Sequence, residues 1–112
     1  MKRYCQTLEL RNDAESIAEY VREHRRVWPE IKAGIREVGI LDMQIYIYEN
    51  KLFMIVDVTD DFDWEKDNEC LARLPRQAEW EAYMSKYQQT EPGAASHQKW
   101  KRMQKIFGLT DN

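Results

Sequence analysis

The chain has 112 residues, of which 43% are apolar and 33% are charged, and its formal net charge is −3. This composition indicates a folded globular protein rather than a disordered or fibrous one, and the interleaved charges argue against nucleic acid as a partner. No apolar run approaches the roughly 20 residues that span a bilayer, and the first residues lack the continuous apolar stretch of a secretion signal. We therefore expect a single domain over residues 1–112, without a membrane partner and located in the cytoplasm.

The first predicted elements are a strand and two helical segments. Residues 3–10 are rich in strand formers and partly alternate in polarity, which predicts a strand. Asn12 or Asp13 can cap a following helix, and Pro29 can open a second helical segment that Gly39 closes. The apolar positions at helical spacing in the first helix are Ile17, Tyr20, Val21, His24 and Trp28.

The middle of the chain predicts a β-hairpin and then a second helical region. Residues 41–48 alternate in polarity, residues 52–58 are apolar on both faces, and Asn50 marks the turn between them. The helical region that follows is interrupted by Pro75. Two short helices or one broken helix fit this pattern equally well.

The last predicted elements are a loop over residues 88–98 and a strand over residues 99–107. The resulting order β, α, β, β, α, β is that of a ferredoxin-like α+β fold, in which helices cover one face of a four-stranded antiparallel sheet. The other face has no cover of its own, although its strands carry apolar side chains in both registers. We therefore expect a symmetric homodimer that pairs two sheets, an assembly of the dimeric α/β-barrel type.

Three aromatic side chains recur every four residues in the segment EYVREHRRVWPE. Tyr20, His24 and Trp28 are expected on one helical stripe, because positions i, i+4 and i+8 share a face. They are either amphipathic core residues or the wall of a polar pocket, where a histidine can exchange a proton near neutral pH. His97, in the predicted loop, is the second candidate histidine.

The two cysteines, Cys5 and Cys70, match no metal-binding or disulfide pattern, and we expect both to be reduced.

The segment EYVREHRRVWPEI resembles the Y-x-x-x-H-x-x-x-W-P-E signature of the L-rhamnose mutarotases, which are small dimeric ferredoxin-like enzymes. The resemblance extends over nearly the whole chain, through the segments GI-x-D-M-Q-IY, LFMIVDV, EWEAYM and MQKIF. It implies a sugar mutarotase that interconverts the α and β anomers of a 6-deoxyhexose, most directly L-rhamnose. It implies no cofactor and no metal.

The resemblance also implies roles for individual residues. His24 matches the family's proton donor, and Tyr20 matches a residue that contacts the substrate. Trp80 matches the first of two tryptophans that line the sugar site, whereas Glu81 replaces the second and Met43 stands where a tyrosine is expected. These two replacements make L-fucose an alternative substrate.

Other positions keep two interpretations each. Glu81 points either inward, where it can accept sugar hydroxyls, or outward as a solvated charge, and Met43 lies either in the core or in the pocket. Trp28 either anchors the helix break or lines the pocket. Trp64 and Trp100 are expected to serve packing or dimer burial.

Two readings from other classes stay open. The same order of elements occurs in dimeric α/β-barrel monooxygenases, in which His24 could be an axial haem ligand. The protein could also bind a sugar without catalysing anomer exchange.

Overall fold

The computed structural model of the protein describes residues 1–91 and 93–111. The elements are β1 (Lys2–Glu9), α1 (Ala14–His24), α2 (Pro29–Glu37), β2 (Ile40–Tyr48), β3 (Lys51–Val58), α3 (Trp64–Ala72), α4 (Gln77–Ser85), α5 (Ser96–Lys99) and β4 (Lys101–Arg102). The strands form one antiparallel sheet in the order β2-β3-β1-β4. This is the predicted ferredoxin-like arrangement, and the prediction is confirmed.

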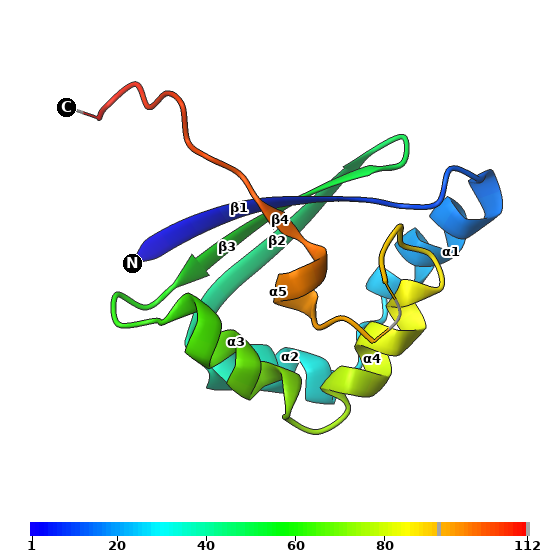
Figure 1. Ribbon diagram of the computed structural model, residues 1–112, viewed down its shortest axis with the longest axis horizontal. Coiled ribbons are helices and arrows are strands. Elements are labelled where there is room, and N and C mark those ends of the chain that lie inside the picture. Colours follow the sequence, from blue (N-terminus) through cyan, green and yellow to red (C-terminus); the bar gives the residue numbers. More distant parts are fainter. Residues whose placement is uncertain (92, 112) are drawn as a thin grey trace.

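All helices lie on one side of the sheet (Figure 1). Leu8, Met54 and Val56 on β1 and β3 are buried on that side. Cys5 and Ile55, which pair across the same two strands, occupy the alternate positions and face the other side. The core is therefore a single layer between the sheet and the helices.

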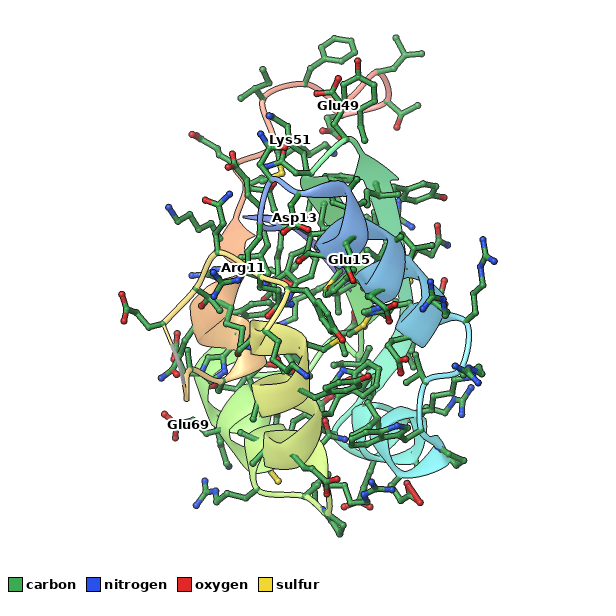
Figure 2. The ribbon with its side chains drawn as sticks, turned by 90° about the vertical axis from the view of Figure 1, so that its right-hand side faces the viewer. Arg11, Asp13, Glu15, Glu49, Lys51 and Glu69 are labelled. Atoms are coloured by element: carbon green, nitrogen blue, oxygen red, sulfur yellow. The ribbon has the colours of Figure 1, made fainter. Side chains whose placement is uncertain are left out.

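The predicted boundaries in the first half are explained by local chemistry. Asp13 caps α1, because its Oδ1 accepts a hydrogen bond from the backbone N–H of Ser16 at 2.8 Å. Gly39 has φ +102° just after α2, which is a left-handed conformation that favours glycine at a helix end. Glu49 and Asn50 form the hairpin turn, and Figure 2 shows Asp13 at the start of α1 and Glu49 at this turn.

The second helical region consists of two short helices, one of the two arrangements that Pro75 allows. Helix α3 ends at Ala72, and α4 begins at Gln77. Arg76, between Pro75 and α4, has φ +65° and so turns the chain sharply. The reversal sets α4 against α2, where Gln77 Nε2 donates to the backbone oxygen of Ile31 at 3.1 Å.

The secondary structure predicted for the end of the chain was wrong. Residues 96–99 form a short helix in place of a loop and the start of a strand, because the Gln98 side chain accepts the backbone N–H of Ala95 at 2.8 Å. Only Lys101–Arg102 then count as strand, and one further bond, from Met103 N to Cys5 O, prolongs the pairing. Beyond it the chain leaves the sheet (Figure 1).

The predicted aromatic stripe is shorter than expected. Helix α1 ends at His24, so Trp28 is not its last residue but the residue that precedes α2. Its ψ of 138° is extended, as the steric demand of Pro29 requires. Within residues 1–91 and 93–111, no helix has the length and apolar character needed to cross a membrane.

Candidate functional site

A cavity of about 420 Å³ lies between the covered face of the sheet and the helices. Small-molecule sites are typically about 300–1,000 Å³, so a monosaccharide is a suitable occupant by size. The side chains that line it and matter below are Tyr20, His24, Met43, Trp80, Glu81, Gln88 and Trp100. They come from α1, β2, α4 and the segments that follow α4 and α5.

His24 is held by its own helix. Its Nδ1 lies 2.9 Å from the backbone oxygen of Tyr20, one helical turn earlier. A carbonyl oxygen can only accept, so Nδ1 carries the proton and Nε2 keeps its lone pair. Burial lowers the pKa of His24 below the ordinary value of 6.5, which favours the neutral ring. The cavity is therefore lined by a neutral imidazole whose Nε2 can accept a proton.

Tyr20 lies beside this imidazole and is deeply buried. The two ring centres are 4.2 Å apart, and only 3% of Tyr20 is exposed. Its hydroxyl oxygen accepts a hydrogen bond from Gln88 Nε2 at 3.4 Å. Burial raises the pKa of Tyr20 well above its ordinary value, so the phenol retains its proton near neutral pH.

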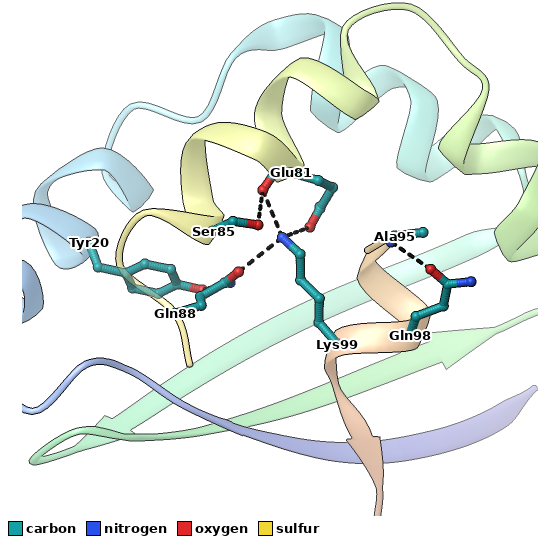
Figure 3. A network of polar contacts seen from close by, with 7 residues as sticks. All are labelled: Tyr20, Glu81, Ser85, Gln88, Ala95, Gln98 and Lys99. Atoms are coloured by element: carbon teal, nitrogen blue, oxygen red, sulfur yellow. Dashed lines mark hydrogen bonds and ion pairs between the residues drawn. The ribbon is translucent and has the colours of Figure 1, made fainter. Parts of the chain in front are cut away.

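A buried ammonium group holds two of the cavity residues, Glu81 and Gln88. Lys99 Nζ donates to three oxygens: the backbone oxygen of Glu81 at 2.7 Å, Glu81 Oε1 at 2.9 Å and Gln88 Oε1 at 3.0 Å (Figure 3). The Lys99 side chain is 0% exposed and that of Glu81 is 19% exposed. Three acceptors, one of them a carboxylate oxygen, therefore compensate the buried charge of Lys99.

The two large apolar walls are built by Trp80 and Trp100, each 5% exposed. The ring centre of Trp80 lies 5.6 Å from that of His24, with the planes at 67°. Met43 is half-buried on β2, paired with Val56 on the covered face of the sheet. A flat indole beside an imidazole can pack against the C–H face of a sugar ring.

Trp28 is the predicted pocket residue that the cavity lining does not include. Its ring centre is 5.0 Å from that of Trp80, and it stacks on Tyr83 with an angle of 7° between the planes. The guanidinium of Arg76 lies over the Trp28 ring, 4.1 Å from its centre. Trp28 therefore supports Trp80 from behind.

The remaining candidates lie elsewhere. His97 lines a second, smaller cavity, and its Nε2 is 3.9 Å from a carboxylate oxygen of Glu65. Trp64 packs on Tyr4, with ring centres 4.5 Å apart. In the described ranges 1–91 and 93–111, no group of three His, Cys, Asp or Glu side chains is placed to hold a metal ion.

Sequence reasoning missed Gln88 and Trp100 as cavity residues, and it missed Lys99, which holds the cavity residues Glu81 and Gln88. Gln88 and Lys99 are polar side chains in what looked like a loop and the start of a strand. Their bonds join positions 11, 18 and 68 residues apart, which no local spacing reveals. Trp100 was visible only as a large aromatic near the chain end.

Comparisons with known proteins show the family of the chain. The model of the L-rhamnose mutarotase family matches residues 3–109. An L-fucose mutarotase of Xanthomonas campestris is 37% identical over 113 residues, covering 99% of this chain and 90% of that protein. An L-rhamnose mutarotase of Enterococcus faecalis is 31% identical over 77 residues, covering 67% of this chain and 71% of that protein.

The fold is also similar to a solved structure. The L-rhamnose mutarotase FA22100 from Formosa agariphila superposes with a TM-score of 0.71 at 20% identity, covering 97% of this chain and 99% of that one.

Proposed function

The chain belongs to the L-rhamnose mutarotase family, and from this premise we propose that it interconverts the α and β anomers of a 6-deoxyhexose, with His24 carrying the proton. The observation that carries the proposed mechanism is the fixed tautomer of His24. Its Nδ1 proton is bound by the backbone of its own helix, and the ring lines the cavity. The function is thus that of an isomerase acting on a carbohydrate.

A single imidazole can perform the whole exchange. Nε2 of His24 removes the proton of the anomeric hydroxyl, and the bond from C1 to the ring oxygen breaks as the C1 carbonyl forms. The imidazolium then gives that proton to the former ring oxygen. The open aldehyde rotates about the bond between C1 and C2, and the reverse steps close the ring on its other face. The two oxygens are bonded to the same carbon, so the proton moves only a short way.

The other cavity residues bind and orient the sugar in this proposal. Tyr20 offers its hydroxyl proton to a sugar oxygen, since its raised pKa keeps the phenol neutral. Trp80 contacts the C–H face of the ring. Glu81 and Met43 line the cavity at the two positions that depart from the family pattern, and Trp28 acts indirectly by supporting Trp80.

The substrate is L-rhamnose or L-fucose. The similarity to an L-fucose mutarotase covers more of the chain than the similarity to the L-rhamnose mutarotase of Enterococcus faecalis, 99% against 67%. We therefore propose L-fucose as the better substrate of the two. We also propose that the protein acts in the cytoplasm.

NMR exchange spectroscopy of anomer interconversion tests the function directly. L-rhamnose and L-fucose are measured in parallel with the wild type, His24→Gln and buffer alone. Faster exchange with the wild type and not with His24→Gln is the expected result. If the wild type binds either sugar but leaves the exchange rate at the buffer value, the protein is a binding module and the proposal fails.

We propose in addition that two copies pair through the open face of the sheet. Tyr46 and Tyr48 are 56% and 73% exposed there, and after β4 the chain carries Ile106 and Phe107, which are 92% and 75% exposed. A second copy that pairs with this face would bury these exposed aromatic and apolar side chains.

Sedimentation at micromolar concentration tests the dimer. Ile55→Lys places a charge in the middle of the open face and should give monomers, whereas Lys66→Glu on the exposed side of α3 should not. A monomeric wild type would refute the pairing.

A further inference from the structure

The hydrogen bonds around Gln88 have a defined direction. Lys99 Nζ has only protons to offer, so the Gln88 atom at 3.0 Å from it must be the amide oxygen. The amide nitrogen of Gln88 then faces the Tyr20 hydroxyl and donates to it. The assignment of the amide therefore follows from the ammonium group and requires no further assumption.

This direction determines what Tyr20 can do. Its oxygen accepts the proton of Gln88, so its own proton is left for another acceptor. Within residues 1–91 and 93–111 no hydrogen bond uses that proton, and the residue lines the cavity. The acceptor that remains is a group inside the cavity.

We infer that Lys99 and Gln88 are positioning residues that make the Tyr20 hydroxyl a hydrogen-bond donor to the bound sugar. Glu81 fixes Lys99 by two of its three bonds, one to its backbone and one to its carboxylate. The cavity then presents a donor at Tyr20 beside an acceptor at His24 Nε2, which fits the ring oxygen and the anomeric hydroxyl of a hexose. This inference rests on the proposed mutarotase function.

Gln88→Glu is the sharpest test, because it nearly preserves size and keeps the oxygen that accepts from Lys99. The introduced carboxylate would accept the Tyr20 proton and so withdraw it from the sugar. Loss of one such hydrogen bond is expected to lower kcat/KM about tenfold. The ratio of variant to wild-type activity should rise as the pH falls, because a protonated carboxyl can donate to Tyr20 as the amide does.

Two comparisons isolate the effect. Gln98→Glu makes the same chemical change on α5 and keeps the oxygen that accepts from Ala95, so it should leave kcat/KM unchanged. In the Tyr20→Phe background, Gln88→Glu should have no further effect, because the hydroxyl through which it acts is missing. An equal loss in both backgrounds, or no loss with Gln88→Glu alone, would overturn the inference.

A second readout needs no activity. The ¹³C resonance of the hydroxyl-bearing ring carbon of Tyr20 should shift in Gln88→Glu without sugar, since the hydroxyl changes from acceptor to donor, and should stay in place in Gln98→Glu. An unmoved resonance refutes the inferred influence of Gln88 on the Tyr20 hydroxyl. If the resonance moves and the wild type catalyses no exchange, the direction of the hydrogen bonds from Lys99 through Gln88 to Tyr20 stands and the proposed function fails.

Discussion

The two sides of the cavity are held in different ways. On α1, His24 is fixed by the backbone of a residue four positions earlier, within a single helix. At the end of α5, Lys99 is fixed by the cavity residues Glu81 and Gln88, which lie 18 and 11 residues away on other segments. The proposed proton-transfer group, His24, therefore depends on local structure, whereas the polar wall of Glu81 and Gln88 depends on the tertiary fold. Substitution of His24 should therefore lower activity alone, and substitution of Lys99 should also lower the free energy of unfolding.

The largest effect is expected from His24→Gln. The variant keeps a polar side chain at the end of α1 and loses the group that accepts the proton, so kcat should fall about 10²–10⁴-fold. The melting temperature should change little, because His24 is half-buried and its hydrogen bond to the backbone oxygen of Tyr20 is local. Anomer exchange and thermal unfolding are measured side by side, with Arg25→Gln as the neighbouring control. A variant without cooperative unfolding would show that His24 serves the core instead.

The next largest effect is expected from Lys99→Met, and it is an effect on stability. The change leaves Glu81 partly buried without its countercharge and Gln88 Oε1 without a donor. We expect the free energy of unfolding to fall by about 2–4 kcal/mol, somewhat less than for a fully buried pair because Glu81 retains some exposure. Urea denaturation measures it, with Lys101→Met on the exposed edge as the control.

A paired change sharpens this prediction. Lys99→Met combined with Glu81→Met removes both charges and should recover part of the loss, because no uncompensated carboxylate remains. If the double variant is as unstable as the sum of the two single variants, the ion pair is not the cause of the loss.

The same contrast explains what the sequence could and could not predict. The sequence could place Tyr20 and His24 on one face because their spacing of four is a property of one helix, and the cap at Asp13 and the turn at Asn50 are local in the same way. Their proposed roles came from the family resemblance. Lys99 was assigned to a strand because its neighbours in the sequence favour one. Its real position is determined by acceptors on α4 and the segment after it, which only the folded chain brings together.

A smaller effect is expected on the pH dependence of kcat/KM, and it arises from His24 alone. Burial lowers the pKa of His24 in the folded protein, so the acid limb of kcat/KM should lie below the ordinary imidazole pKa near 6.5. Above that pH the ring is neutral in the folded and unfolded states alike.

The stability consequence follows from the same shift. Below about pH 6.5 the unfolded chain takes up the proton first, so the free energy of unfolding should decrease as the pH falls toward the lowered pKa. Denaturation at pH 7.5 and at pH 5.5 measures it. The decrease should be smaller in His24→Gln, and an equal decrease would assign the loss to other groups.

The smallest effect is expected from Trp28→Phe. Trp28 does not line the cavity, and it stacks on Tyr83 beneath the guanidinium of Arg76. A phenyl ring keeps most of this stacking, so kcat/KM should change less than about threefold, since less than about 0.7 kcal/mol of transition-state binding is at stake. Trp80→Phe, by contrast, changes a wall of the cavity and should raise KM clearly more. Steady-state exchange rates for both variants, with either sugar, make the comparison. An increase in KM for Trp28→Phe as large as that for Trp80→Phe would contradict the supporting role and show that Trp28 contributes to sugar binding as much as Trp80 does.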